Sequence, residues 1–297
     1  MNLGLIINIL MQRRSLRKHD QWSREALRSY QKSQIKQLRE FSVEKSSFYR
    51  NLYRGRENAP FEEWPVVTKA MLMGAFDKAV TDPKIKLKEI EEHLKSVKGD
   101  ELYLGRYRVC ATSGTTGRRG IFPCDRDEWA HIMASYARTY EWAGVRADLL
   151  HWTTAAVVSS RNPLHQSARV GASAHGPWMP VLRLDALDPL SESISRMNAF
   201  QPKNLIAYAS ILETLAKEAI AGRLKIRPKV VISASEVLTE KTKSLVQKAW
   251  GKVAYDAYAA TETAGLASPC PEAGRSHLYE DLVITEVVDE QNRPTPP

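Results

Sequence analysis

Hydrophobic and polar positions divide the chain into a helical first part and an alternating second part. Apolar residues recur at about helical spacing over residues 3–11 and 20–54, and residues 69–77 and 87–98 have the composition of helices. We therefore expect the first 100 residues to be mainly helical.

From residue 101 onward, short β-rich runs alternate with helical patterns. Asp125 is expected to cap a helix, and Gly222 and Gly251 follow the expected ends of two later helices. Strands that alternate with helices are typical of an α/β domain with a largely parallel sheet. The expected strands are 106–111, 149–158, 203–207, 229–234, 252–258 and 283–289, and the expected helices are 125–142, 188–199, 209–221 and 239–250.

Composition excludes several classes of protein. With 297 residues, 43% hydrophobic and 26% charged, the chain has ordinary globular usage and can bury a substantial core. No apolar run approaches the ~20 residues that span a bilayer, so stable membrane insertion is not expected. Three cysteines, Cys110, Cys124 and Cys270, form no CxxC pair and indicate neither a disulfide framework nor a complete zinc site. We therefore expect the protein to be located in the reducing cytoplasm.

The net charge of +9 is concentrated at the beginning of the chain. Residues 1–60 hold 13 Lys or Arg and 5 Asp or Glu. Such a segment can indicate nucleic acid or an anionic membrane as a partner. We interpret these charged residues instead as the solvated face of amphipathic helices, because apolar residues recur between them. These are Trp22, Leu27, Tyr30, Ile35, Leu38, Phe41 and Phe48.

The stretch from Thr112 to Gly120 contains three glycines and no apolar residue. Glycines let backbone N–H groups close around an anion, while hydroxyls add donors and Arg118 and Arg119 add charge. Glycines three apart exclude a Walker loop, and GxGxxG is absent. We predict a phosphate-binding loop, although the loop alone is also compatible with an ordinary turn. Its candidate ligands are Thr112, Ser113, Gly114, Thr115, Thr116 and Gly117.

Three motifs, in this order, resemble those of the adenylate-forming, or AMP-binding, enzymes. Residues 112–117 resemble the phosphate-binding loop, 233–236 the segment that lines the adenine pocket, and 258–262 the Tyr-Gly-x-Thr-Glu motif. The wider chain resembles the phenylacetate–CoA ligase branch and its capsule-cluster, CapK-like relatives. The stretches that carry this likeness are Ser46 to Arg50, Pro65 to Lys69, Phe76 to Pro83, Gln201 to Ser210 and Cys270 to Glu286.

This resemblance implies an AMP-forming acid–thiol ligase that uses ATP, Mg²⁺ and CoA. An acyl-adenylate would form first and an acyl-CoA second, with an aromatic or similarly compact acid. The implied catalytic residues are Glu262, which would bind Mg²⁺, Thr261 beside the α-phosphate, and Arg118. The implied nucleotide-binding residues outside the loop are Ser235, Glu236, Tyr258, which would stack on adenine, and Ala259.

The sequence departs from the family pattern at two places. Arg118-Arg119-Gly120 stands where many relatives have Pro-Lys, and Ala259 replaces a glycine. Residues 171–175 nearly match a nucleophile elbow but lack its last glycine, and residues 174–178 are assigned instead to a wall of the acyl pocket. Cys270 and His277 are interpreted as a core cysteine and a surface histidine, because four zinc ligands at recognisable spacing are not visible.

Residues 1–100 are expected to form the helical part, and 101–297 the nucleotide-binding part, of one adenylation domain. The family's ribose-binding Asp, hinge and small C-terminal domain with its catalytic Lys have no counterpart here, so weak MgATP binding and little acyl-CoA formation are expected. Two alternatives stay open: an adenylating enzyme with a different acceptor, and a non-catalytic nucleotide-binding or interaction protein. A homodimer is also left open, and nucleic acid is not an expected partner.

Overall fold

The computed structural model describes residues 3–56, 58–112, 114, 119–147, 151–173, 179–270, 272, 274–291, 293 and 295. The helices are α1 (Leu3–His19), α2 (Arg24–Lys45), α3 (Ser47–Leu52), η1 (Phe61–Glu63), α4 (Lys69–Gly74), α5 (Phe76–Ala79), α6 (Leu87–Ser96), α7 (Arg126–Trp142), α8 (Gln166–Ser173), α9 (Leu190–Phe200), α10 (Ala209–Ile220) and α11 (Glu240–Trp250). The strands are β1 (Arg108–Ala111), β2 (Ile121–Cys124), β3 (Ala155–Ser159), β4 (Val181–Asp185), β5 (Asn204–Tyr208), β6 (Val230–Ala234), β7 (Ala254–Ala260), β8 (Ala264–Pro269) and β9 (Ser276–Leu278).

The main sheet has seven strands in the order β4-β3-β5-β6-β7-β8-β9. The five strands from β4 to β7 in this order are parallel to one another. Strand β8 pairs antiparallel with β7 on one side and with β9 on the other. Strands β1 and β2 form a separate antiparallel hairpin. The prediction of an α/β fold with a largely parallel sheet is confirmed.

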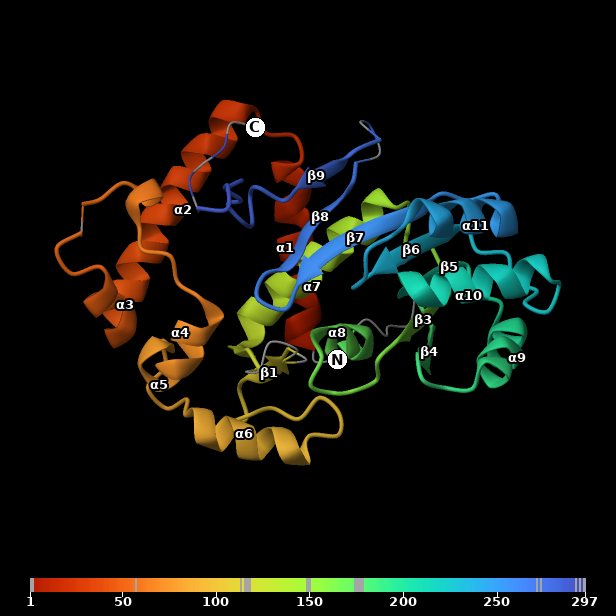
Figure 1. Cartoon of the computed structure of the whole chain (residues 1–297), viewed down its shortest axis with the longest axis horizontal. Helices are drawn as coiled ribbons and strands as arrows, with labels where there is room; N and C mark the ends of the chain where they lie inside the picture. The colour runs from red at the N-terminus through yellow and green to blue at the C-terminus, as the bar shows by residue number, and fades with distance from the viewer. Residues whose placement is uncertain are drawn as a thin grey trace.

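Helices cover both faces of this sheet (Figure 1). On one face, α9, α10 and α11 bury Met197, Leu212 and Val246 against residues of β3, β5 and β6. On the other face, the end of α7 packs Tyr140 and Ala143 over the same strands. A strand alternates its side chains between the two faces of the sheet. Since helices cover both faces, the parallel strands carry apolar side chains on both of them.

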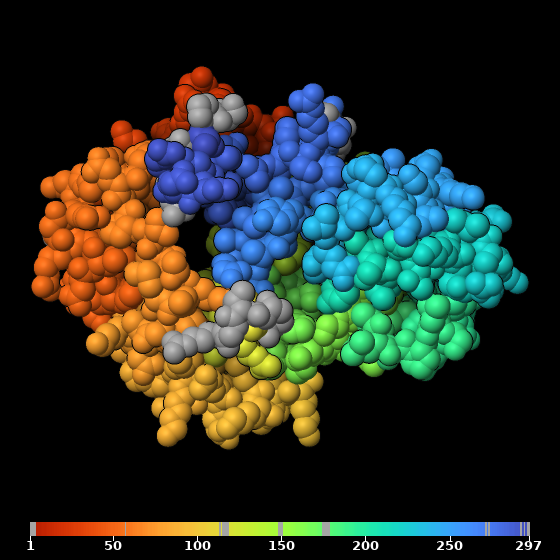
Figure 2. Space-filling view, viewed as in Figure 1, coloured from red at the N-terminus to blue at the C-terminus, as the bar shows by residue number. Residues whose placement is uncertain are grey.

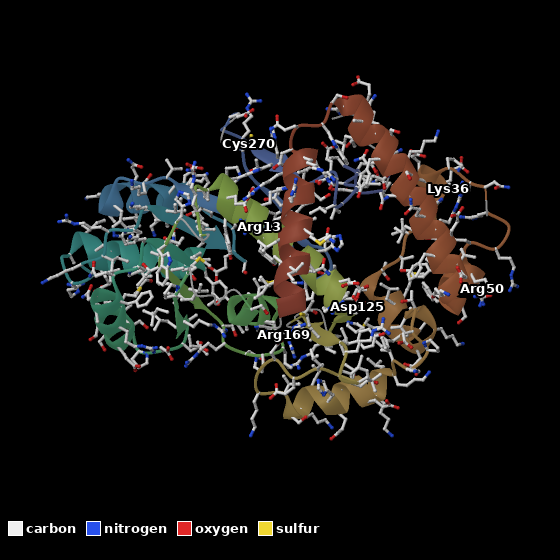
Figure 3. The ribbon with its side chains drawn as sticks, turned by 180° about the vertical axis from the view of Figure 1, so that it is seen from behind. Arg13, Lys36, Arg50, Asp125, Arg169 and Cys270 are labelled. Carbon is white, nitrogen blue, oxygen red and sulfur yellow. The ribbon has the colours of Figure 1, made fainter. Side chains whose placement is uncertain are left out.

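Helix α7 connects the sheet to the rest of the molecule. Asp125 caps it as predicted, since its side chain accepts hydrogen bonds from the backbone N–H groups of Asp127 and Glu128. Helix α1 packs along α7, and Arg13 on α1 pairs with Glu141 (Figure 3). The helical elements α2 to α6 lie on the side of α1 and α7 away from α9 to α11 (Figure 1).

A buried ion pair fixes α7 to the segment after β9. Arg138 is 5% exposed and donates two hydrogen bonds, of 2.7 and 2.8 Å, to the carboxylate of Asp281. The ring of His19, the last residue of α1, lies 2.8 Å from the same carboxylate. This cluster joins three segments that are far apart in sequence.

Residues 20–54, expected to be helical, form two helices. Ser46 interrupts them, since its hydroxyl accepts a hydrogen bond from the backbone N–H of Tyr49 and so begins α3. The expected burial of the apolar stripe is only partial, because Leu38 is 60% and Phe41 48% exposed. Lys36 and Arg50 lie on the outer side of this region (Figure 3).

Several sequence-based boundaries need correction. Residues 283–289 do not form the predicted strand and follow an irregular path after β9. The expected strand 149–158 is ordered as β3, from Ala155 to Ser159, while residues 148–150 lie outside the described part. Strands β2, β4, β8 and β9 and helix α8, which are three to eight residues long, were not predicted. In the described residues, no helix is long and apolar enough to cross a membrane.

Candidate functional site

The predicted phosphate loop connects β1 to β2. Thr112 closes it at its base: its backbone N–H donates to the carbonyl of Gly120 at 2.9 Å, and its hydroxyl accepts from the backbone N–H of Gly120 at 2.8 Å. Because both groups of Thr112 are used in this way, Thr112 shapes the loop. The other predicted ligands Ser113, Thr115, Thr116, Gly117 and Arg118 lie outside the described residues.

Two glycines of this loop occupy positions that a side chain would disturb. Gly114 has φ +76°, and a Cβ there would lie 2.8 Å from Cγ of Arg119. A Cβ on Gly120 would lie 2.8 Å from the ring of Phe122 and 3.2 Å from Cδ of Lys69. The lysine at the start of α4 therefore reaches the loop, although it is 51 residues away from Gly120 in sequence.

Thr261 and Glu262 lie in the tight turn between the antiparallel strands β7 and β8. Glu262 is exposed at the tip of this hairpin and Thr261 is half-buried. Among the described residues, none forms a hydrogen bond or an ion pair with the carboxylate of Glu262. The geometry thus presents a carboxylate to the solvent at the end of a well-paired hairpin.

The segment 164–166 connects this hairpin with the phosphate loop. The carbonyl of Leu164 accepts a hydrogen bond of 2.8 Å from the backbone N–H of Ala111, directly before Thr112. Two residues later, the side-chain amide of Gln166 donates to the carbonyl of Thr261 at 3.2 Å. Gln166 is 5% exposed, so its end of this bridge is buried, while Thr261 at the other end is half-buried. Two motifs about 150 residues apart in sequence therefore share one short support.

His165 lies between these two contacts and near the loop's arginine. Burial lowers the pKa of His165, and the positive charge of Arg119 lowers this pKa further. Its imidazole is therefore neutral at pH 7. A neutral ring beside a cationic loop adds a hydrogen-bonding group without adding further positive charge.

Ser235 and Glu236 follow β6 and have different roles. Ser235 has φ +65°, a left-handed conformation that is unusual for a residue with a side chain. The carboxylate of Glu236 accepts a hydrogen bond of 2.8 Å from the backbone N–H of Ser210, in the first turn of α10. Glu236, predicted to bind nucleotide, thus holds the start of a helix, and Ser235 is the member of the pair that faces a cavity.

Tyr258 and Ala259 point to opposite faces of β7. Tyr258 is 61% exposed, whereas Ala257 and Ala259 line a cavity under α7. The pairing of β7 with β8 shifts register between Tyr258 and Ala259, which marks an irregularity at this point. The tyrosine ring is therefore available to a ligand on the outer side, as stacking requires.

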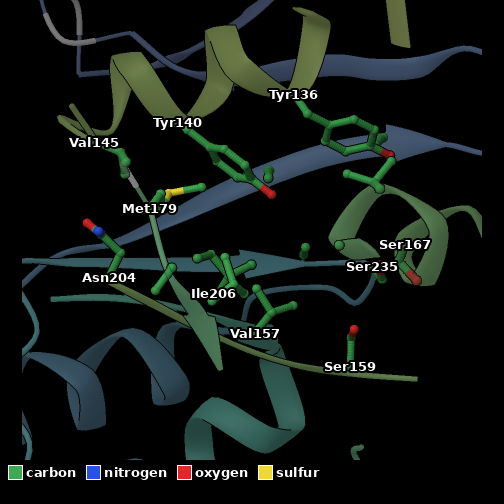
Figure 4. A pocket seen from close by; sticks show the side chains of 17 residues that line it. Tyr136, Tyr140, Val145, Val157, Ser159, Ser167, Met179, Asn204, Ile206 and Ser235 are labelled. Atoms are coloured by element: carbon green, nitrogen blue, oxygen red, sulfur yellow. The ribbon is translucent and has the colours of Figure 1, made fainter. Parts of the chain in front are cut away.

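A cavity of about 70 Å³ lies between α7 and the main sheet (Figure 4). One end is near the carboxyl ends of the parallel strands, with Ser159, Ser235 and Ala259. The other end reaches the beginnings of β3, β4 and β5. The remaining lining residues are Tyr136, Tyr140, Val145, Ala155, Val157, Ser167, Val170, Gly171, Met179, Val181, Asn204, Ile206, Ala234 and Ala257.

Figure 2 shows a hollow between the helical region and the C-terminal strands, beside the β7–β8 hairpin. In open α/β sheets, ligands bind outside the carboxyl ends of the strands. The candidate site therefore has a polar part near the carboxyl ends of the parallel strands and an apolar part beneath α7. Residues 174–178, assigned to the acyl-pocket wall, lie outside the described residues, but Met179 directly after them lines the cavity. No group of three potential metal-ligating side chains occurs in the described parts of the chain.

Sequence reasoning missed several of these groups. Lys69 belongs to a stretch that resembled the family, but no role was predicted for it. Gln166 and Tyr136 have no motif, and only the fold shows that their side chains meet at 2.9 Å. The spacing of Tyr136 and Tyr140 could have predicted that both lie on the same side of their helix, because residues four apart share one face of a helix.

No protein-family model and no curated protein matches this sequence. Solved structures match in fold. An open conformation of 2-hydroxyisobutyryl-CoA ligase in complex with 2-HIB-AMP and CoA superposes with a TM-score of 0.68 at 18% identity, covering 89% of this chain and 57% of the ligase. The same ligase in its thioesterification state gives a TM-score of 0.68 at 18% identity, over 93% and 58%.

These matches confirm the predicted fold, that of the N-terminal core of an adenylate-forming enzyme. The chain spans somewhat more than half the length of the ligases that it matches. Identity of this order establishes the architecture. The resemblance to the phenylacetate–CoA ligase branch stays a prediction.

Proposed function

We propose that this chain is the core of an enzyme that activates a small carboxylic acid with ATP and passes the acyl group to CoA. The observation that carries the proposal is the shared support of the two motifs by Leu164 and Gln166. It joins a glycine loop and a carboxylate-bearing turn at the edge of the sheet where an apolar cavity opens. The solved structures of similar fold contain 2-HIB-AMP and CoA, which is consistent with this chemistry.

In this proposal the loop 112–120 binds the β- and γ-phosphates of ATP. Its cations would be Arg118 and Arg119 on the loop itself and Lys69 from α4, whose side chain reaches Gly120. Arginine binds phosphate with a planar fork of donors, and lysine acts as a compact point charge. Three cations would offset much of the charge that the triphosphate brings into the site.

Glu262 would bind Mg²⁺, and Thr261 would lie at the α-phosphate. The exposed carboxylate at the hairpin tip fits a hard cation that prefers oxygen ligands and retains several waters. When bound, the ion supplies positive charge to the phosphate oxygens. Tyr258 would stack on adenine from its exposed side, and Ser235 and Ala259 would line the junction between the nucleotide and the acid.

The proposed reaction has two balanced steps. A carboxylate oxygen of the acid attacks the α-phosphorus, the bond from that phosphorus to the β-phosphate oxygen breaks, and pyrophosphate leaves. The CoA thiol then attacks the acyl carbonyl, its proton is lost, and AMP leaves. Because the residues form no covalent bond with the substrate, their contribution is positioning and charge stabilisation.

The cavity under α7 would hold the acyl group. Its described lining carries no charged side chain, so an ionised group on the acyl chain would be buried without a partner. We therefore propose a compact acid without a second charge, and an aromatic acid fits the sequence resemblance. The domain division at residue 100 and a Mg²⁺ requirement belong to the same proposal.

Pyrophosphate exchange with a panel of carboxylic acids tests adenylation, and CoA-dependent release of AMP tests the acceptor. We expect little CoA-dependent release of AMP from this chain alone, and slow exchange that requires an acid and Mg²⁺. Glu262→Gln should lower its rate by about 10²-fold or more, while Glu290→Gln, at an exposed position after β9, should keep the parent rate. Absence of any MgATP-induced shift in melting temperature would contradict the proposal and favour a non-catalytic interaction protein.

A further inference from the structure

We propose that the Tyr140 hydroxyl recognises an uncharged hydrogen-bonding substituent, a hydroxyl or a carbonyl, on the acyl group of the acid. This inference rests on the proposed function and makes Tyr140 a determinant of specificity. It adds a polar contact to a cavity whose middle is otherwise apolar.

The Tyr140 hydroxyl projects from α7 into the cavity over Val157 and Ile206 (Figure 4). In the described part of the chain, this hydroxyl forms no hydrogen bond. Tyr140 is half-buried, and tyrosine hydroxyls in such positions usually find a hydrogen-bond partner. Here the space that such a partner would occupy is the cavity itself.

Tyr136, one helical turn earlier, provides an internal comparison. It lines the same cavity, but its hydroxyl donates a hydrogen bond of 2.9 Å to the side-chain carbonyl of Gln166. The two tyrosines on one face of α7 therefore differ in whether the protein supplies a partner for the hydroxyl. The first is used by the protein near the carboxyl edge of the sheet, and the second is available to a ligand further inside.

The chemistry of the surroundings limits what Tyr140 can bind. Burial raises the pKa of Tyr140 to about 12, so the group stays a neutral phenol at physiological pH. A neutral phenol both donates and accepts, and thus fits a hydroxyl or a carbonyl. The described lining has no charge to pair with a second carboxylate or an amine.

The position of Tyr140 also sets a length. One turn of α7 separates it from Tyr136, which is about 6 Å along the helix axis. With the reacting carboxyl near Ser235 and Ala259 at the cavity mouth, the substituent lies several bonds into the acyl group. Acids that carry it next to the carboxyl should not benefit from this contact.

Non-hydrolysable acyl-adenylate mimics test this idea without turnover. We would measure Kd by calorimetry for 5′-O-(N-acylsulfamoyl)adenosines whose linear acyl chains form matched pairs of equal length, ending in a hydroxyl or in a methyl group. The acetyl mimic, which leaves the inner cavity empty, reports the nucleotide site alone. The full chain is used as parent, Tyr140→Phe and Tyr136→Phe.

In the parent, we expect the hydroxyl member of at least one pair to bind on the order of tenfold more tightly. Tyr140→Phe should reduce this preference to about twofold or less, whereas Tyr136→Phe should retain it even if all Kd values rise. Equal affinities within every parent pair, or a preference that survives in Tyr140→Phe, would overturn the inference while acetyl-mimic binding leaves the proposed function intact. Failure of the acetyl mimic to bind would overturn both.

Discussion

Replacing Gln166 with Met removes the link between the two motifs and keeps the size of the side chain. The amide accepts from the Tyr136 hydroxyl at 2.9 Å and donates to the carbonyl of Thr261 at 3.2 Å. Each bond is worth about 1 kcal/mol net, so Gln166→Met should lower the free energy of unfolding by about 2 kcal/mol. Because Thr261 is half-buried, its carbonyl can form a hydrogen bond with water in the variant, so the loss of unfolding free energy stays near this value.

Urea unfolding, followed by circular dichroism, measures this loss directly. Gln247→Met is a matched control, because Gln247 is exposed on α11 and its side chain supports neither motif. That control should change the free energy of unfolding by less than about 0.5 kcal/mol. A double-mutant cycle with Tyr136→Phe should give a coupling of about 0.5–1 kcal/mol, since both substitutions remove the same bond.

The same variant tests whether the link matters for binding. Without Gln166, the turn that carries Thr261 and Glu262 loses its tie to the loop, and misplacement of catalytic groups by about 1 Å can cost 10²-fold in rate. We expect MgATP affinity to fall at least about fivefold in Gln166→Met. Parent-like stability would refute the assignment of the buried bridge, and lowered stability with unchanged MgATP affinity would refute its role in joining the motifs.

Two further predictions concern the loop and the buried ion pair. Gly114→Ala and Gly144→Ala both place a side chain at positive φ, +76° and +90°, and each should lose about 1 kcal/mol of stability. Only Gly114→Ala displaces Arg119, so only that variant should bind MgATP more weakly by calorimetry. Burial raises the pKa of Asp281, but hydrogen bonds and charge from Arg138 outweigh this and hold the pKa below 3.8. The carboxylate therefore stabilises the fold at neutral pH, and this contribution is lost as the pH falls below about 3.8. Asp281→Asn should cost about 1–3 kcal/mol at pH 7, because Arg138 keeps Asp20 at 3.3 Å as a partner, and between pH 4 and 2.5 its melting temperature should fall less steeply than that of the parent.

The alternating part of the chain was the most predictable from sequence. Helices α7, α10 and α11 begin and end within two residues of their expected limits, because Asp125, Gly222 and Gly251 signal those limits chemically. The strand predicted over residues 283–289 was wrong, although Val283, Ile284, Val287 and Val288 have high strand propensity. Strand propensity needs a neighbouring strand to pair with, and the described sheet ends at β9.

The N-terminal helices show a different limit of sequence reasoning. Helical spacing correctly predicted α2, but it does not tell which face is covered, and Leu38 and Phe41 remain exposed. Likewise, Thr112 and Glu236 were identified as motif positions, but the hydrogen bonds that they form with the protein's own backbone were not predicted. Both use their polar groups on the protein's own backbone, a choice that depends on segments distant in sequence.

The arrangement of the candidate site explains why its motifs can be found in the sequence and its inner cavity cannot. The parallel strands β6 and β7 bring their carboxyl ends to one edge, so the residues that follow them converge whatever the intervening helices contain. The loop after β1 belongs to a separate hairpin and is tied to this edge through Leu164 and Gln166. The inner cavity is different. Its lining comes from α7 and from the first residues of β3, β4 and β5, which have no common spacing in sequence. Tyr140 therefore gains its proposed role only from the fold, as the tyrosine of α7 whose hydroxyl the protein leaves to a ligand.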